Sequence, residues 1–270
     1  MVSLPAKVDK VIQDYLSKLL AVCQNNISGV YLTGSVPPGD YYSKKSDIDF
    51  ITVFQELPGM NLIHQLKSIH HHIERTHNYP KLNGYYVSAS GLASNQLSYP
   101  SFFKNKMYVE RKLELIHFSL LELKYFSQRI YGIPADQLPL RVELEEVMKE
   151  LQQNINSYWT GWVQKHSGLS IHRMLLLVFP RLTEWGVLGV ARQLYTLETG
   201  AVTTKLGAGI FYLDKLPEEF KQIMATAIST RRLNKTEFMP SRKRANDTLN
   251  CMNWMILAFN ERYHTKLSGC

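Results

Sequence analysis

Two aspartates separated by one residue are the clearest candidates for chemistry in this sequence. Asp47 and Asp49 flank Ile48 at the start of the β-rich run Ile48–Phe54. Because side chains alternate along a strand, the two carboxylates project from one face, about 7 Å apart along the strand. Mg²⁺ prefers such hard oxygen ligands, together with waters and substrate phosphates. The pair therefore predicts a metal site that acts at a phosphate.

A glycine and a serine precede these aspartates at the end of another predicted strand. Gly34 and Ser35 open a loop rich in proline and glycine. Glycine lets backbone N–H groups approach a phosphate closely. A lone Asp-x-Asp is common on solvated loops, but the order strand, Gly-Ser, loop, Asp-x-Asp, strand is rarer. The arrangement favours metal-assisted transfer at a nucleotide phosphate over a plain surface turn, with metals bridging the attacking and leaving oxygens.

The first half of the chain reads as strands alternating with helices, which favours a small α/β domain. Apolar residues at three- and four-residue spacing predict the first helix, and β-rich runs bounded by turn residues predict the strands. The predicted elements are a helix over 5–23, strands over Ile27–Thr33 and Ile48–Phe54, a helix opened by Pro58, a third strand over Gly84–Ser88 and a fourth over Leu113–Phe118.

Long helical patterns dominate from about Leu138 onward and predict an α-helical bundle. We therefore place one domain at residues 1–150 and a second, helical domain at 151–270. Helices are predicted near 140–165, 170–180, 185–199, 204–213, 217–231 and 243–266.

Composition limits the classes of function. The 270 residues are 45% hydrophobic and 20% charged, which excludes a largely disordered chain. A net charge of +8 favours anionic partners such as nucleotides and phosphates, but no RNA-binding motif accompanies it, so nucleic acid is not the favoured partner. No apolar run approaches the roughly 20 residues that span a bilayer. An odd number of widely spaced cysteines indicates a reducing, cytoplasmic location.

The motif residues resemble a known superfamily. Gly34-Ser35 followed by Ser46–Phe50 is similar to the signature of the DNA polymerase β-like nucleotidyltransferases. The closer resemblance is to the streptomycin/spectinomycin (aminoglycoside) adenylyltransferases and their uncharacterised bacterial relatives. The segments of the second half that carry this closer resemblance are Val187–Gly200, Lys205, Ala208-Gly209 and Leu216-Pro217.

The resemblance implies an α+β fold, a reaction and a set of residues. A nucleotidyltransferase domain with a mixed sheet would precede the helical bundle, with ATP and the acceptor in the cleft between them. AMP would pass from ATP to a hydroxyl of a small molecule, with an aminoglycoside or aminocyclitol antibiotic as the favoured acceptor. Gly34 and Ser35 would bind the phosphates. Asp47 and Asp49 would be catalytic and would hold two Mg²⁺ ions.

The resemblance also assigns two basic residues of the second half, Arg192 and Lys205, to the triphosphate. Arginine suits bidentate binding of phosphate, and lysine acts as a point charge. The alternatives are that Arg192 pairs with a nearby glutamate, and that Lys205 is solvated at a helix start.

One position departs from the superfamily pattern. Active members carry a third acidic residue on a neighbouring strand, and the best alignment here places Asn83 at that position. Asn cannot accept a proton at neutral pH and is a weaker Mg²⁺ ligand. The alternative function is therefore a catalytically weak or inactive protein of this fold that binds nucleotide or a partner. Other glutamates that could replace the acid are Glu143, Glu145, Glu146 and Glu184.

Three further clusters have bland interpretations. The histidines at 70–72 and 77 are more typical of an exposed helix face than of a zinc centre. The basic residues at 231–232 and 242–244 are more typical of a solvated helix surface than of an anion site. The aromatic residues between Tyr158 and Trp185 suit base stacking and core packing equally well.

Overall fold

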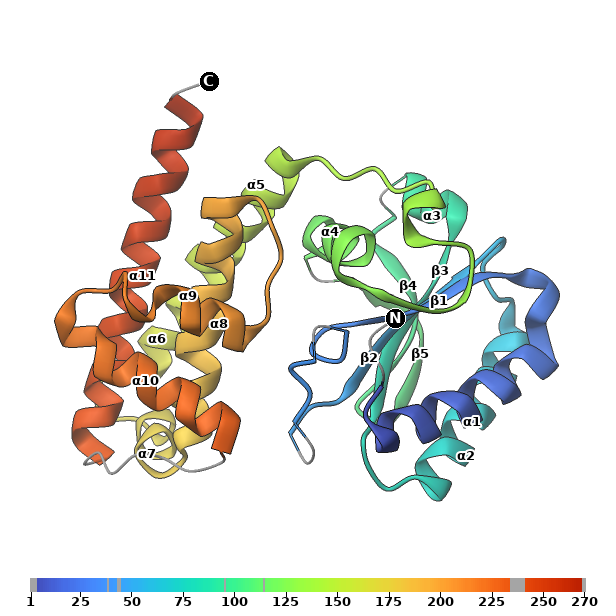
Figure 1. The fold of residues 1–270 in the computed structure, drawn as a ribbon, viewed down its shortest axis with the longest axis horizontal. Coiled ribbons are helices and arrows are strands. Elements are labelled where there is room, and N and C mark those ends of the chain that lie inside the picture. Colours follow the sequence, from blue (N-terminus) through green and yellow to red (C-terminus); the bar gives the residue numbers. More distant parts are fainter. Residues whose placement is uncertain are drawn as a thin grey trace. The chain divides into compact units, whose positions relative to one another are not determined.

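A computed structural model describes residues 4–37, 39–42, 45–94, 96–113, 115–233 and 241–268. The chain forms two compact units, Met1–Glu143 and Leu144–Cys270. The first unit is a sheet with helices on its faces, and the second is built from helices (Figure 1). The expected α+β fold, with a mixed sheet followed by a helical bundle, is confirmed.

The sheet has six strands in the order β5-β4-β3-β2-β1-β6. The pair β2 and β3 is parallel, and every other neighbouring pair is antiparallel, so the sheet is mixed. The strands are β1 (Ile27–Thr33), β2 (Ile48–Phe54), β3 (Leu82–Ser88), β4 (Ser98–Phe103), β5 (Lys106–Lys112) and β6 (Gln128–Gly132).

Alternation along the strands divides the core between the two faces of the sheet. On β2, Phe50 and Phe54 pack with the helices α1 (Ala6–Cys23) and α2 (Met60–Thr76). Ile51 and Val53 point the other way and pack with α3 (Ala89–Ala93) and α4 (Ile116–Phe126). Asp49 is in phase with Ile51 and Val53, so its side chain belongs to the face that α4 covers.

The predicted fourth strand over Leu113–Phe118 is wrong. Helix α4 begins at Ile116, directly after Leu115, which has a left-handed backbone with φ 53°. Ile116, Leu120 and Leu123 recur at helical spacing and enter the core of that face. The six-residue window of the prediction was too short to show this period.

A chain of buried polar side chains runs through the other face of the sheet. The Tyr15 hydroxyl lies 3.1 Å from that of Tyr86 and 3.4 Å from that of Thr52. The Tyr86 hydroxyl also meets His70 Nε2 at 2.6 Å, and the His70 ring stacks on Phe102 with 3.8 Å between ring centroids. Burial, with a smaller contribution from the neighbouring His71, lowers the pKa of His70 to about 3. His70 is thus a neutral core residue.

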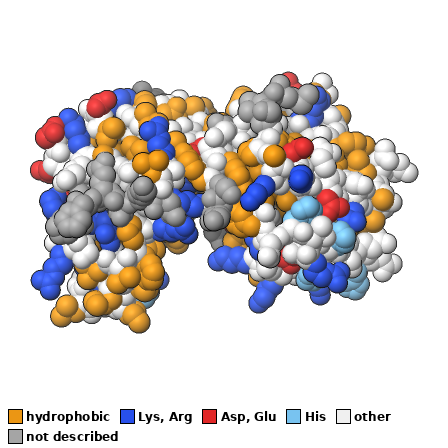
Figure 2. Space-filling view, turned by 60° about the horizontal axis from the view of Figure 1, so that its bottom comes forward, with side chains coloured by type: hydrophobic (Ala, Val, Ile, Leu, Met, Phe, Trp, Pro, Cys, Tyr) orange, Lys and Arg blue, Asp and Glu red, His pale blue; other side chains and the backbone are white. Residues whose placement is uncertain are grey.

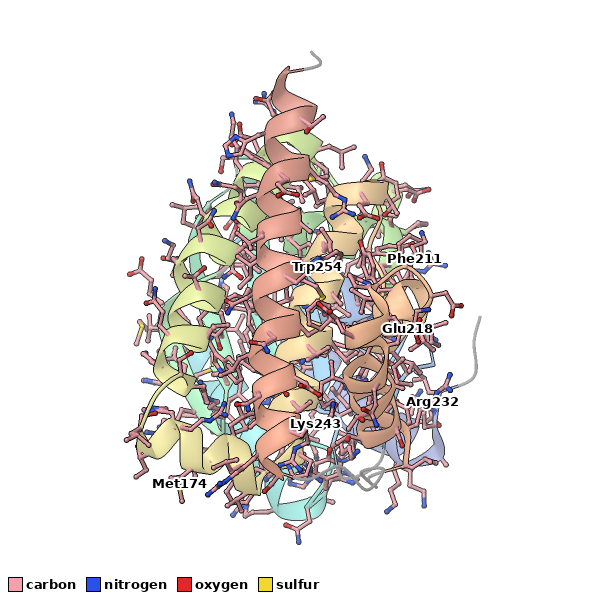
Figure 3. All side chains as sticks on the ribbon, turned by 90° about the vertical axis from the view of Figure 1, so that its left-hand side faces the viewer. Met174, Phe211, Glu218, Arg232, Lys243 and Trp254 are labelled. Atoms are coloured by element: carbon pink, nitrogen blue, oxygen red, sulfur yellow. The ribbon has the colours of Figure 1, made fainter. Side chains whose placement is uncertain are left out.

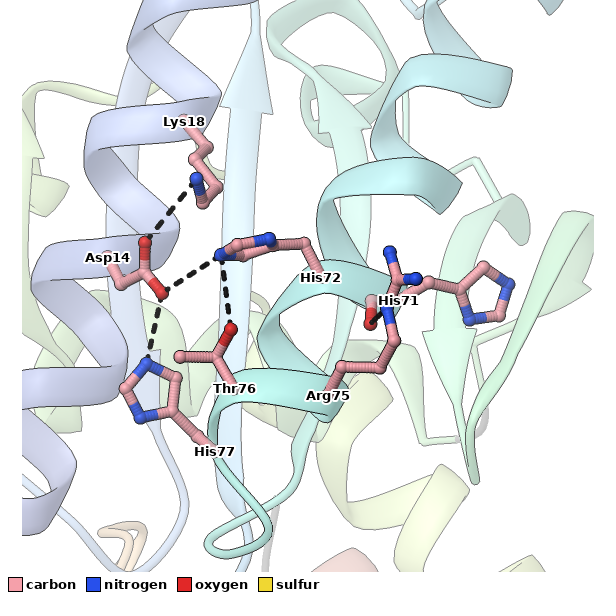
Figure 4. A network of polar contacts seen from close by, with 7 residues as sticks. All are labelled: Asp14, Lys18, His71, His72, Arg75, Thr76 and His77. Atoms are coloured by element: carbon pink, nitrogen blue, oxygen red, sulfur yellow. Dashed lines mark hydrogen bonds and ion pairs between the residues drawn. The ribbon is translucent and has the colours of Figure 1, made fainter.

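His72 and His77 connect helices α1 and α2 (Figure 4). His77 Nε2 lies 3.0 Å and His72 Nε2 lies 3.6 Å from the same oxygen of Asp14, Oδ2. Lys18 Nζ lies 3.7 Å from the second oxygen of Asp14. These partly exposed contacts place polar side chains across the seam between the two helices.

The helical unit follows the predicted pattern, with helix starts and ends shifted by a few residues. Helix α11 runs along the bundle in Figure 3, where Lys243 and Trp254 mark two points on it. The helices are α5 (Leu144–Asn154), the π-helical turn η3 (Ile155–Trp159), α6 (Thr160–His166), α7 (Ile171–Val178), α8 (Pro180–Thr199), α9 (Lys205–Leu213), α10 (Glu218–Leu233) and α11 (Ser241–Ser268).

Charged residues of the basic stretches help to hold this bundle together. Arg231 Nη1 donates to Glu184 Oε1 over 3.2 Å, and both side chains are only 10% exposed. Arg244 donates to the carbonyl oxygens of Leu176 and Leu177, which lie at the end of α7. These two arginines are structural, so a solvated surface is the wrong interpretation for both positions.

Within the described part of the chain, no single helix is long and apolar enough to cross a membrane. Helices α7 and α8 pass that test of length and composition only as a pair, which is bent by 98°.

The burial of neutral His70 predicts that the free energy of unfolding decreases at low pH. The lowered pKa of His70 means that the folded state binds this proton more weakly than the unfolded chain does, whose value is near 6.5. The stabilisation is therefore complete above pH 6.5 and is lost as the pH falls toward 3. Urea unfolding at several pH values should show the His70→Gln variant losing less stability over this window, by up to about 1.4 kcal/mol per pH unit.

His64→Gln, at an exposed position of the same helix, is the control variant because it leaves His70 and its buried contacts in place. If the unfolding free energies of the wild type and His70→Gln changed in parallel with pH, His70 would not be the neutral core residue described above.

Candidate active site

Three strand ends meet at one edge of the sheet and bring the sequence motif together. Thr33, the last residue of β1, pairs with Asp49 on the antiparallel strand β2. Asp49 pairs in turn with Asn83 on the parallel strand β3. Gly34 and Ser35 follow β1, and Asp47 directly precedes β2, so all of these residues lie at this edge.

Gly34 is held to glycine by two independent constraints. Its φ of +70° lies in the left-handed region, where a Cβ atom is strained. A Cβ built at this position would also lie 2.4 Å from Asp49 Oδ2. The carboxylate of Asp49 therefore packs directly on the Gly34 backbone, as expected of a site that presents carboxylates and backbone N–H groups to one ligand.

Asp47 is half-buried beside this pair. Desolvation raises the pKa of Asp47 above its ordinary value, and the hydrogen bond from Asn83 and the charge of Lys81 partly oppose that rise. A carboxylate that is costly to keep charged in the free protein gains more than an exposed one when a cation neutralises it. The surroundings of Asp47 thus favour a bound cation.

Asn83 lies beside the carboxylates, as the sequence predicts, and both ends of its amide are engaged. Its Nδ2 donates to Asp47 Oδ2 over 2.9 Å, and its Oδ1 accepts the backbone N–H of Lys104 at 3.0 Å. The residue is 8% exposed. Asn83 therefore orients Asp47 as a hydrogen-bond donor, a role that an ionised carboxylate cannot take.

Glu122 is a site residue that the sequence analysis missed. It projects from α4, and its Oε1 accepts the backbone N–H of Gly34 at 3.2 Å. The segment just before it was predicted to be a strand, which hid the helix that carries it. A helical period continued through Phe126 would have placed Glu122 near the apolar face that meets the sheet.

The two remaining predicted residues lie in the helical unit. Lys205 is the first residue of α9, and its Nζ lies 5.8 Å from the centroid of the Trp185 ring on α8. Arg192 follows Trp185 by seven residues, about two turns, so both lie on one face of α8. Lys205 therefore lies against Trp185, and Arg192 lies about two turns further along the same helix as that ring. Gly34, Ser35, Asp47 and Asp49 lie together in the other unit.

The glutamates considered as replacements for the missing acid all have basic partners. Glu143 meets Arg141, and Glu145 and Glu146 both meet Lys149, in exposed ion pairs. Glu184 forms the buried ion pair with Arg231. Glu184 therefore already has a structural role.

The donor set fits Mg²⁺ better than a transition metal. Among the described residues, no group of three or more His, Cys, Asp and Glu side chains is placed to hold a metal ion. Two carboxylates on one strand face are enough for Mg²⁺, which keeps several waters and takes substrate phosphates as further ligands. Asp47 and Asp49 are those two carboxylates.

An open hollow of about 580 Å³ lies elsewhere on the α/β unit and contains none of the predicted site residues. Figure 2 shows histidine side chains among lysine and arginine side chains on this unit. The residues that line the hollow are Ser68, His71, Glu74, Arg75, Lys81 and Asn105.

The chain is similar to known proteins in sequence over one segment and in fold over most of its length. Residues 180–256 match the family model described as aminoglycoside adenylyltransferase, C-terminal domain. The chain resembles the aminoglycoside adenylyltransferases. The crystal structure of spectinomycin adenyltransferase AAD(9) from Enterococcus faecialis, with ATP and spectinomycin, has the same fold, with a TM-score of 0.67 and 17% identity. The match covers 92% of this chain and 98% of that adenylyltransferase, whereas no curated protein matches in sequence.

The contact between Gly34 and Asp49 predicts a graded loss of stability. Gly34 and Gly39 both have positive φ, of +70° and +77°, but only Gly34 faces an atom that a Cβ would meet. Either change to alanine should cost about 1–2 kcal/mol for the backbone. Gly34→Ala should cost about 1–3 kcal/mol more, because the new methyl group must displace the carboxylate of Asp49.

Urea unfolding of the two variants measures this difference. Equal losses in Gly34→Ala and Gly39→Ala would show that Asp49 does not pack on Gly34.

Proposed function

We propose that this protein is a Mg²⁺-dependent nucleotidyltransferase that transfers AMP from ATP to a hydroxyl of a small molecule. The observation that carries the proposal is the packing of the Asp49 carboxylate on Gly34, at the edge where Asp47 and Asn83 meet. The adenylyltransferase family match over residues 180–256 supports the same reaction class.

The site residues of the α/β unit have distinct proposed roles. Asp47 and Asp49 would hold Mg²⁺, and a bound Mg²⁺ would neutralise charge on the phosphates and polarise the α-phosphorus. The backbone N–H groups of Gly34 and Ser35 bind phosphate oxygens. Asn83 keeps the Asp47 carboxylate turned toward the edge of the sheet through its hydrogen bond of 2.9 Å.

Arg192 and Lys205 are the proposed triphosphate ligands of the helical unit. The guanidinium of Arg192 and the ammonium of Lys205, which lies 5.8 Å from the centroid of the Trp185 ring, would supply two positive charges for phosphates. Because pyrophosphate leaves in the reaction, charges that bind its phosphates also stabilise the leaving group.

The acceptor is a small hydroxylated molecule, and an aminocyclitol is the favoured class because AAD(9) was crystallised with spectinomycin. The acceptor oxygen attacks the α-phosphorus, the bond to pyrophosphate breaks, and the acceptor proton passes to solvent. Both ends of the Asn83 amide are engaged, so Asn83 takes no proton. Since general-base help is worth about 10²–10⁴ in rate, transfer is expected to be slow.

A second candidate function follows from that same observation. With Asn83 in place of an acid, the chain would be a catalytically weak or inactive protein of this fold that binds nucleotide or a partner. Intact ATP binding together with silence across a panel of hydroxylated acceptors would select it.

The carboxylate pair predicts the result of the main test. With ATP, Mg²⁺ and a panel that includes spectinomycin and streptomycin, the wild type should release labelled pyrophosphate. Asp47→Asn and Asp49→Asn should each lower the rate roughly a hundredfold or more, because charge on the phosphates is no longer neutralised. Asp136→Asn, at an exposed position of the same unit, is the control and should keep the wild-type rate.

Wild-type rates in both Asp47→Asn and Asp49→Asn would contradict the assignment of these carboxylates as catalytic Mg²⁺ ligands. Loss in both variants with unchanged circular dichroism would support it.

Arg192→Ala should weaken ATP binding more than AMP binding. A charge-assisted contact to the β- or γ-phosphate is worth about 1.5–3 kcal/mol, or about ten- to a hundredfold in affinity. Calorimetry with both nucleotides measures the difference. Arg232→Ala, at an exposed arginine of the same unit, should change neither affinity. An equal loss for ATP and AMP would assign Arg192 to structure instead.

A further inference from the structure

Glu122 accepts a hydrogen bond from the Gly34 N–H, the backbone donor that the proposed function assigns to a phosphate. The Gly34 N–H donates to Glu122 Oε1 over 3.2 Å, and the Glu122 side chain is half-buried. Helix α4, which carries Glu122, covers the face of the sheet to which Asp49 belongs. A third carboxylate therefore reaches the edge where Asp47 and Asp49 stand, from an element far away in the sequence.

We propose that Glu122 occupies the place of a phosphate at Gly34 and makes the site select a metal-complexed polyphosphate over a metal-free one. Glu122 is thus a specificity-determining residue of the site, and this inference rests on the proposed function.

Glu122 and a bound phosphate would compete for the same Gly34 N–H. Carboxylate and phosphate oxygens are both anionic acceptors, and each forms charge-assisted hydrogen bonds with backbone N–H donors. The single proton of the Gly34 N–H cannot point fully at both. A phosphate that binds there must therefore displace Glu122 or share the donor with it.

The selection of a metal-complexed polyphosphate over a metal-free one follows from the negative charges of the three carboxylates. A metal-free polyphosphate meets the carboxylates of Glu122, Asp47 and Asp49 at one edge of the sheet, and like charges repel strongly where solvent screening is weak. The half-buried state of Asp47 and Glu122 indicates such weak screening. A divalent cation neutralises part of the phosphate charge, so the metal complex is repelled less.

Two substitutions separate charge from occupancy. Glu122→Gln removes the charge but keeps a side-chain oxygen that can accept the Gly34 N–H. Glu122→Ala removes both the charge and the acceptor. Glu110→Gln removes one negative charge from an exposed position on β5 of the same unit and is the matched control.

The experiment is calorimetry of ATP and of inorganic pyrophosphate, each with Mg²⁺ and each with EDTA. Glu122→Gln should tighten metal-free binding about tenfold and Mg²⁺-complexed binding less, so that the ratio of the two affinities narrows. Glu122→Ala should narrow the ratio at least as much, and Glu110→Gln should leave it unchanged. The unfolding midpoint of each variant shows that it is folded.

Weaker binding in Glu122→Gln, or an unchanged ratio, overturns the proposal. Tighter pyrophosphate binding in Glu122→Gln without any ATP binding supports the role of Glu122 and rejects the nucleotidyltransferase function. If neither probe binds to the wild type or to the folded variants, both proposals fall.

Discussion

The pairing of β1, β2 and β3 at their shared edge is the constraint on which the candidate site depends. The antiparallel pair sets Thr33 opposite Asp49, and the parallel pair sets Asp49 opposite Asn83. Because side chains alternate, a slip of one residue in either pair would turn Asp49 to the opposite face of the sheet. The apolar core prevents such a slip, since Ile51 and Val53 would have to leave the face that α4 covers.

The site gathers groups that do not stabilise the fold. Asp47 is desolvated, Gly34 has a left-handed backbone, and Glu122 brings further negative charge to the same edge. The side chain of Asn83 is neutral, and its hydrogen bond to Asp47 partly offsets the cost of burying that carboxylate. Functional sites commonly keep such unfavourable groups, which a ligand of opposite charge then stabilises. The helical unit differs, because its buried charges Glu184 and Arg231 satisfy each other.

Local patterns were enough to predict the elements that carry the motif. Both β1 and β2 begin and end where their β-rich residues do. The position of Asn83 near the carboxylates came only from the resemblance to the superfamily, because the predicted third strand began one residue after it, at Gly84. The turn between β4 and β5 has positive φ at Lys104 and Asn105, without the glycine that usually marks such a turn, so that hairpin was missed. The contact between Gly34 and Glu122 joins residues 88 positions apart, and no local pattern encodes it.

The distances in sequence between the site residues imply an order of assembly. Gly34 directly follows β1 and Asp49 lies on β2, the antiparallel neighbour of β1, so their contact needs only one short loop to close. Asn83 joins Asp47 across 36 positions, after α2 has crossed over to make the strands parallel. Glu122 closes the longest loop of the three, and contacts of long sequence separation form slowly. A folding chain should therefore bring Gly34 and Asp49 together before Glu122 joins them, and a partly folded α/β unit would have its Gly34 N–H without the Glu122 acceptor.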